Sequence, residues 1–243
     1  MNLKGKVVLL TGAKRIGQIV AEELAKKGAN LAITYRSSKE EAEAMCVACV
    51  ALGVKSLPFQ ADLSKEDEIK NMVSAIKQEF GRIDILVHMA APYPKTPLEE
   101  VTMEEFNSIQ TSISGSALML AKYIIPLMME NKQGKIIFFS DWSVLERPYT
   151  DYSAYNMAKA GINSLTKGLA RQVAPNITVN AIAPGPMIKP PDLTEEENEE
   201  ALSKTPLRKW GGALPIAQAV NFLLENDFVT GGILPVDGGR SVA

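Results

Sequence analysis

Cysteine and histidine are scarce in this sequence, whose 243 residues contain two cysteines and one histidine. The cysteines, Cys46 and Cys49, lie in the middle of a segment with helical periodicity, residues 39–52. A redox Cys-x-x-Cys pair sits at a helix N-terminus, where the helix dipole stabilises the thiolate. We therefore expect two reduced, structural thiols, and we expect no resident metal ion.

Long apolar runs and an excess of one charge are also missing. No apolar run approaches the ~20 residues that a membrane-spanning helix needs, and the stretch from Met1 to Lys6 lacks the apolar core of a signal peptide. The net charge of −2 gives no electrostatic basis for binding nucleic acid or an acidic membrane surface. These absences predict a cytoplasmic protein that acts on a small-molecule substrate.

Short β-branched runs alternate with amphipathic segments along the whole chain. Strands are predicted at residues 7–10, 30–34, 56–60, 83–88, 135–139, 178–182 and 232–235. Helices are predicted at residues 17–27, 39–52, 65–80, 103–129, 153–173 and 213–225. The alternation predicts an α/β fold, a doubly wound (Rossmann-like) parallel sheet in a single domain spanning residues 1–243.

Residues 185–212 interrupt this alternation with prolines and a run of glutamates. Thr194 is followed three residues later by Glu197, the spacing of a capping box that begins a short helix. Such sheets place ligand lids just beyond the carboxyl end of a strand, so we expect a helical substrate lid here. The alternative is a solvated acidic helix that serves solubility.

Tyr155 and Lys159 lie four residues apart in the predicted helix 153–173, which puts them on one face. The lysine ammonium favours the phenolate and is expected to lower the pKa of the tyrosine towards neutrality. A tyrosine of this kind can exchange protons with a substrate. The alternative is a surface pair that shares a helix by chance.

The segment from Val7 to Gly17 predicts a strand, a tight turn and a helix start. Gly12 allows the chain to turn, and Gly17 allows the helix to pack closely on the strand. The helix N-terminus then offers free N–H groups and a positive dipole to a pyrophosphate. The pattern therefore predicts a dinucleotide site.

Basic residues gather where the nucleotide ribose is expected. The second strand is followed by Arg36, and the first acidic residue after it is Glu40, while Lys14 and Arg15 project from the first turn. An acidic residue at this place suits the ribose 2′-hydroxyl of NAD, and a basic one suits the 2′-phosphate of NADP. We expect NADP(H); the alternative is that these are surface residues.

With these motifs placed, the chain resembles the short-chain dehydrogenase/reductase family over essentially its full length. The matching motifs are Thr11-Gly12 to Gly17, Asp62-Leu63, Tyr155 to Lys159, Asn180-Ala181-Ile182-Ala183-Pro184-Gly185 and Val236-Asp237-Gly238-Gly239. Arg15 and Tyr35-Arg36-Ser37 make the pteridine reductases the most similar members. The resemblance implies hydride transfer from NADPH, Tyr155 as the proton donor, Lys159 on the nicotinamide ribose, and a homotetramer.

The resemblance also implies which residues contact the cofactor. They are Gly12, Lys14, Arg15, Ile16, Gly17, Arg36, Ser37, Asp62, Leu63, Ala90, Tyr155, Lys159, Pro184 and Gly185. The turn from Gly12 to Gly17 is one residue shorter than usual in the family, which leaves the role of Lys14 open.

Two positions depart from the family pattern where it has asparagine. His88 replaces a structural asparagine after the fourth strand, and we interpret it as a buried packing residue. Ser112 aligns with the asparagine that usually completes the relay, so a relay through Ser112 and water is predicted.

Asp141 stands where the family usually has its active-site serine at the end of the fifth strand, and pteridine reductases resemble this sequence there. Ser140 and Ser143 are the alternative hydroxyls. A serine can donate to a carbonyl oxygen, whereas an ionised carboxylate only accepts and repels an oxyanion. Asp141 therefore favours a substrate with N–H donors, or must itself be protonated.

Tyr93 lies where pteridine reductases carry the aromatic residue that stacks on the pterin. An aromatic face over the cleft would hold a flat heterocycle, and the alternative is a tyrosine that packs on its own loop. Trp142, beside Asp141, is predicted to wall the substrate pocket or to be core.

These observations leave three functions in order of preference. The first is an NADPH-dependent reductase of a pterin or similar C=N heterocycle, with Asp141, Tyr93 and Trp142 at the substrate and Tyr155, Lys159, Asp141 and Ser112 catalytic. The second is a carbonyl or 3-oxoacyl-thioester reductase of the same fold. The third is a non-catalytic NADP-binding sensor.

Overall fold

The computed structural model describes residues 1–12, 14–191 and 193–243. Within them the strands form one sheet in the order β3-β2-β1-β4-β5-β6-β7, and every pair is parallel. The strands are β1 (Val7–Thr11), β2 (Asn30–Tyr35), β3 (Ser56–Gln60), β4 (Ile85–His88), β5 (Gly134–Phe139), β6 (Ile177–Pro184) and β7 (Ile233–Val236). The predicted doubly wound parallel sheet is confirmed.

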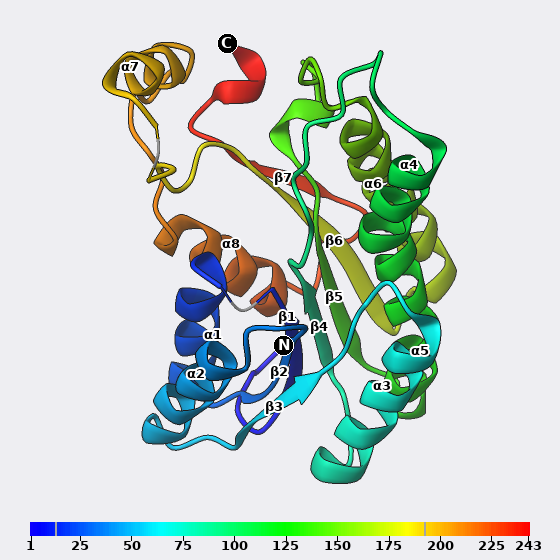
Figure 1. Cartoon of the computed structure of the whole chain (residues 1–243). Coiled ribbons are helices and arrows are strands. Elements are labelled where there is room, and N and C mark those ends of the chain that lie inside the picture. Colours follow the sequence, from blue (N-terminus) through cyan, green and yellow to red (C-terminus); the bar gives the residue numbers. More distant parts are fainter. Residues whose placement is uncertain (13, 192) are drawn as a thin grey trace.

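Helices cover both faces of the sheet (Figure 1). One face carries α1 (Ile16–Lys26), α2 (Lys39–Ala51) and α8 (Leu214–Glu225). The other carries α3 (Glu66–Phe80), α4 (Met103–Gln110), α5 (Ser116–Glu130) and α6 (Ser153–Val173). Because both faces are covered, the central strands are continuous apolar runs rather than alternating ones.

Alternate residues of one strand supply two separate cores. Val8 and Leu10 of β1 pack under α1 and α8, and Leu9 between them packs under the helices of the opposite face. All three side chains are fully buried. This two-sided burial fixes the register of β1, because a shift of one residue would exchange its two faces.

The order of the strands reverses between β1 and β4, which lie side by side although β2 and β3 come between them in sequence. In open α/β sheets, ligands bind in the crevice outside the carboxyl ends of the strands at such a reversal. The fold therefore places Thr11, His88 and Ser140, at or just after the ends of β1, β4 and β5, around one crevice.

The helix predicted at 103–129 is continuous but not uniform. Between α4 and α5 the segment η1 (Thr111–Gly115) winds as a π-helix. Side-chain hydroxyls bond to carbonyls of the preceding turn here, Ser114 Oγ to Gln110 O (3.1 Å) and Ser116 Oγ to Ser112 O (2.8 Å). Such π segments are frequent at functional sites, and this one faces the crevice.

The stretch Met103–Glu130 has the length and apolar composition of a membrane-crossing helix. Leu120 and Ile124 within it are fully buried in the core against the sheet. This packing is that of a core helix of the fold.

The segment between β6 and α8 contains the predicted short helix, α7 (Glu195–Ser203). Thr194 and Glu197 form the predicted capping box in both directions. The described residues also form the short 3-10 helices η2 (Trp142–Val144) and η3 (Arg240–Val242). Cys46 and Cys49 are free and buried in α2, and burial raises the pKa of the Cys49 thiol to about 11.

Candidate active site

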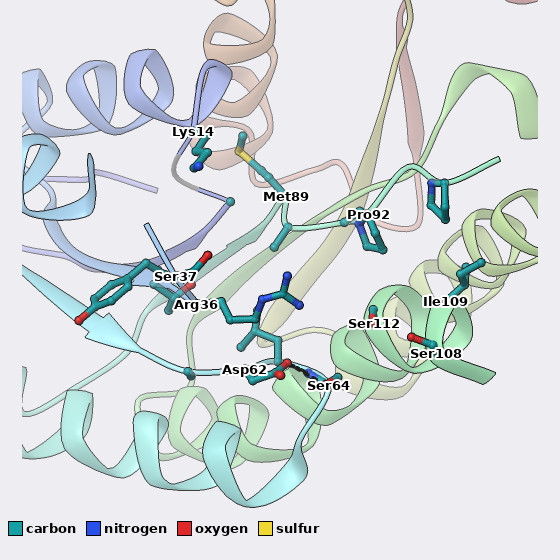
Figure 2. A pocket seen from close by; sticks show the side chains of 18 of the residues that line it. Lys14, Arg36, Ser37, Asp62, Ser64, Met89, Pro92, Ser108, Ile109 and Ser112 are labelled. Carbon is teal, nitrogen blue, oxygen red and sulfur yellow. Dashed lines mark hydrogen bonds between the residues drawn. The ribbon is translucent and has the colours of Figure 1, made fainter. Parts of the chain in front are cut away.

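A cavity of about 880 Å³ occupies the crevice at the carboxyl ends of the strands (Figure 2). Its lining comes from the first turn, the ends of β2 and β3, the segment after β4, and the helix α4 with η1. Predicted cofactor residues in this lining are Gly12, Lys14, Arg36, Ser37, Asp62, Leu63 and Ala90, and Ser112 lines it from the opposite side.

The turn after β1 is built on close backbone approaches. Gly12 has φ of +82°, and a Cβ there would lie 2.7 Å from Ala90 N. A Cβ on Gly17 would lie 2.3 Å from Gly12 O. Both positions therefore require glycine. Helix α1 begins at Ile16 after Arg15, so its N-terminus lies beside this turn.

Arg36 extends between the first turn and the segment after β3, with Lys14 on one side and Asp62 on the other (Figure 2). Lys14 Nζ lies 3.3 Å from Glu41 Oε1 in an exposed ion pair, which is worth little in water. Asp62 accepts hydrogen bonds from Ser64 Oγ (2.7 Å) and Ser64 N (3.0 Å). These bonds, with the charge of Arg36, lower the pKa of Asp62.

Tyr155 and Lys159 are both buried at the start of α6. The Tyr155 hydroxyl donates to Asp141 Oδ2 at 2.8 Å. Lys159 Nζ donates to Phe139 O at 2.7 Å and lies 5.7 Å from the centre of the Tyr155 ring. The predicted pair thus shares one helix face, and the partner of the phenol is a carboxylate.

The pKa of Tyr155 shifts in the direction opposite to the prediction. Burial and the charge of Asp141, which also accepts its hydrogen bond, raise the pKa of Tyr155 instead of lowering it. Burial lowers the pKa of Lys159 to about 8. From the sequence, only Lys159 was expected to shift the pKa of the phenol. In the fold, Asp141, just after β5, also contacts the phenol hydroxyl.

Asp141 is the residue of its segment that meets Tyr155. Its Oδ1 accepts from Ser143 N (2.9 Å), which caps η2 and fixes the carboxylate. Ser140 Oγ is buried without a hydrogen-bond partner among the described residues. Ser143 Oγ is buried 3.4 Å from Asn156 Oδ1. Of the three candidates Ser140, Asp141 and Ser143, the geometry therefore puts the Asp141 carboxylate against the phenol.

His88 is buried and fully bonded, as a packing residue should be. Its Nδ1 lies 2.8 Å from Thr11 Oγ1, and its Nε2 lies 3.0 Å from Ser116 Oγ. The Ser116 hydroxyl donates its proton to Ser112 O, so Nε2 carries the histidine proton and Nδ1 accepts from Thr11. Burial lowers the pKa of His88 to about 3, and the ring is neutral.

Ser112 lies in η1 at the cavity wall, and its backbone oxygen accepts from Ser116. Among the described residues its hydroxyl makes no direct hydrogen bond to Lys159, whose ammonium bonds to Phe139 O. The relay through Ser112 and water stays a prediction.

Four aromatic residues gather beside Tyr155. The Tyr93 ring stacks on Tyr152 (4.7 Å between centres) and meets Tyr155 edge to face (4.9 Å). Trp142 is buried, and its Nε1 donates to Tyr149 Oη at 2.6 Å. Tyr93 thus packs on its neighbours and stands directly over the phenol.

Pro184 is the last residue of β6, and Gly185 follows it. Gly185 packs so closely on the residue after β7 that a Cβ would lie 2.5 Å from Asp237 Cα. It lines a second, smaller pocket together with Tyr93, Trp142 and three residues that sequence reasoning missed, Tyr149, Trp210 and Arg240. Their only sequence signals are an aromatic run before Tyr155 and an arginine after the final glycine pair.

Comparison with known proteins finds oxidoreductases that are similar to this chain over nearly its whole length. A family model described as enoyl-(acyl carrier protein) reductase matches residues 12–241. The 3-oxoacyl-[acyl-carrier-protein] reductase FabG of Staphylococcus aureus is 36% identical over 242 residues, covering 96% of this chain and 97% of the relative. The 2-dehydro-3-deoxy-D-gluconate 5-dehydrogenase of Formosa agariphila is 32% identical, covering 98% and 93%.

Solved structures of dehydrogenases and reductases are also similar to this chain over nearly its whole length. A short-chain dehydrogenase/reductase from Serratia marcescens is 31% identical with a TM-score of 0.92, covering 99% of this chain and all (100%) of that one. NAD⁺-bound xylitol dehydrogenase is 26% identical with a TM-score of 0.91, covering 98% of this chain and 100% of the other. These relatives do not include a pteridine reductase, so the closer similarity to that group stays a prediction.

Proposed function

Since this chain belongs to the short-chain dehydrogenase/reductase family, we propose that it is an NADPH-dependent reductase of carbonyl compounds of the 3-oxoacyl kind. The observation that carries the proposal is the buried pair of Tyr155 and Lys159, one turn apart on α6. The 3-oxoacyl reductases among the relatives favour this second of the expected functions over the heterocycle reductase placed first.

The crevice fits a dinucleotide on its own geometry. Gly12 allows the first turn to pack closely on Ala90, and the N-terminus of α1 beside this turn would offer its free N–H groups to a pyrophosphate. Arg36, Ser37 and Lys14 line the same cavity, where a 2′-phosphate would meet the fork of Arg36. This basic corner supports NADP(H) over NAD. The reduced nicotinamide would supply the hydride, with Ala90, Pro184 and Gly185 beside it.

The proton comes from Tyr155. Its raised pKa keeps the phenol protonated at neutral pH, and its O–H donates to Asp141 Oδ2. A substrate carbonyl oxygen beside Tyr155 would take over this hydrogen bond and receive the proton as negative charge develops on it. Lys159, with a pKa of about 8, is positive at neutral pH and stabilises the phenolate that remains.

Asp141 supports a second candidate, reduction of a C=N bond in an amino heterocycle such as a pterin. A carboxylate 2.8 Å from the reacting phenol accepts hydrogen bonds and repels a developing oxyanion. A substrate with N–H donors would pair with it, and the partly exposed ring of Tyr93 beside Tyr155 would contact a flat heterocycle.

One substitution separates the candidates. Asp141→Ser supplies the hydroxyl donor of the carbonyl reductases, so NADPH oxidation with an acetoacetyl thioester should rise about 10-fold or more, since an oxyanion donor is worth that much. Reduction of a dihydropterin should fall with the same variant. Activity of the wild type on the pterin alone would reject the first candidate. NADPH binding without turnover of either substrate would favour the sensor.

We also propose a cytoplasmic homotetramer, with residues 185–212 acting as a substrate lid. Met157 on α6 and Leu118 and Met129 on α5 leave apolar surface exposed on the helices expected at the subunit interfaces. Light scattering on the purified protein tests the assembly, and a dimer or monomer would reject it.

A further inference from the structure

Beyond Tyr93 lies a second pocket of about 200 Å³. Its walls are the rings of Tyr93, Trp142, Tyr149 and Trp210, and the side chain of Arg240 is its cationic group. A volume of this size accommodates one end of a small ligand rather than a whole drug-sized molecule. The pocket therefore suits the part of a substrate that is not being reduced.

Arg240 is held in place with donor capacity left over. Its Nη1 donates to Ala201 O at 2.8 Å, and its guanidinium carbon lies 5.2 Å from the centre of the Trp142 ring. Among the described residues no carboxylate lies within ion-pair distance of the Arg240 guanidinium. The carboxylate of Glu200, on the adjacent helix α7, pairs with Lys204 instead. The stacked guanidinium keeps further N–H groups for a ligand.

The lid helix α7 closes the other side of the pocket. Trp210 Nε1 donates to Asn198 Oδ1 at 2.9 Å, and Ala201 of the same helix accepts from Arg240. The C-terminal η3 and α7 thus meet across the pocket, near the end of β6 (Figure 1). A ligand on Arg240 would touch both segments.

Two residues of the pocket wall, Tyr93 and Trp142, connect this pocket to the reacting group. The Tyr93 ring lies 4.9 Å from the Tyr155 ring, and Trp142 follows Asp141, which accepts the hydrogen bond of Tyr155. A substrate with its carbonyl at Tyr155 would therefore have its other end close to this pocket.

We propose that Arg240 binds a carboxylate of the substrate, so that the enzyme selects small oxo acids with a flat or apolar body. A carboxylate matches the planar guanidinium fork, and the single cation in an aromatic pocket favours a monoanion over a phosphate. The catalytic part of this proposal rests on the proposed carbonyl reduction, and the binding part does not.

The binding part is tested by fluorescence, because both tryptophans of the chain, Trp142 and Trp210, line this pocket. Benzoate and its neutral analogue benzamide are titrated into the purified protein, with and without NADP⁺. We expect benzoate to bind at least ~10-fold more tightly, the value of a charge-assisted hydrogen bond. Equal binding of the two would overturn the proposal.

Variants assign the preference to the guanidinium. Arg240→Met should abolish the benzoate preference, Arg240→Lys should retain part of it, and Arg171→Met, an exposed arginine on α6, should leave it unchanged. Thermal unfolding of each variant checks that it is folded. A preference that survives in Arg240→Met would also reject the assignment, and Arg240→Lys decides if the methionine variant does not fold.

The catalytic part of the proposal is tested by comparing the reduction of a 3-oxo acid with that of its methyl ester. The ratio of kcat/KM for the acid to that for the ester should fall about 10- to 100-fold in Arg240→Met, because a charge-assisted bond to the acid is lost. An unchanged ratio would contradict substrate selection. If the wild type reduces neither compound, carbonyl reduction fails while the fluorescence result still decides the pocket.

Discussion

The two pockets of the site, the proposed dinucleotide half and the proposed substrate half, depend on different features of the chain. The first turn of the dinucleotide half depends on glycines at positions where a side chain would strike Ala90 N or Gly12 O. The substrate half is formed by side chains, the aromatic rings and Arg240, drawn from segments far apart in the chain. The first half is specified by local motifs, and the second exists only after folding.

Removing the hydroxyl of Tyr155 should have the largest effect on activity and should leave dinucleotide binding unchanged. In Tyr155→Phe we expect the turnover rate to fall by about 10²–10⁴-fold, the worth of a positioned general acid. NADPH affinity, measured by fluorescence titration, should stay within a factor of about 3, because the phenol hydroxyl is bonded to Asp141 and not to the first turn. Tyr152→Phe, a stacked neighbour, is the control and should retain most activity.

Changing Arg36 should affect the dinucleotide half alone. In Arg36→Gln the preference for NADPH over NADH should fall by about 10- to 100-fold, because one charge-assisted bond to the 2′-phosphate is lost. Dissociation constants for both dinucleotides measure this directly. An unchanged preference would show that Lys14 or Arg15, and not Arg36, binds the 2′-phosphate of NADPH.

Lys159 is proposed to stabilise the phenolate of Tyr155 through its positive charge. Its pKa is about 8, below the ordinary value of 10.5, so the ammonium is present below pH 8 and is lost as the pH rises through 8. We therefore expect kcat/KM to be flat at neutral pH and to fall by about tenfold per pH unit above it. A profile that stays flat to pH 10 would show that the charge is not needed. The same fall should appear in Arg36→Gln.

The smallest effect should come from paired glycine substitutions. Gly168, exposed in α6, has open space around its Cβ position, so Gly168→Ala should stabilise the fold by about 0.5–1 kcal/mol. Gly12→Ala should destabilise it by about 1–3 kcal/mol, through strain at φ of +82° and contact with Ala90. Chemical denaturation measures both. A loss of stability in Gly168→Ala would indicate that α6 packs against another subunit there.

The contrast between the halves also explains what the sequence could predict. The turn at Gly12 and Gly17 and the capping box at Thr194 are local, so their residue types and spacing were sufficient. The direction of the Tyr155 pKa shift was mispredicted because it depends first on burial and then on the charge of Asp141, which lies just after β5, fourteen positions earlier in the chain. Arg240 was missed because its pocket needs Tyr93, Trp142 and α7 together.

The π-helical segment η1 was missed for a related reason. The apolar periodicity of residues 103–129 predicts one regular helix, and the widened turn depends on serine hydroxyls that bond back to carbonyls. Serine in a helix gives no sign of this before the fold is known.

The bonding of the sole histidine has a spectroscopic consequence. His88 connects Thr11, at the end of β1, to Ser116, just after η1, through both ring nitrogens. In protein carrying ¹⁵N-histidine, the imidazole region of the NMR spectrum will therefore come from one ring, protonated on Nε2. Its chemical shifts should be independent of pH near neutrality and should move when the first turn is occupied, which makes His88 a built-in probe of the crevice.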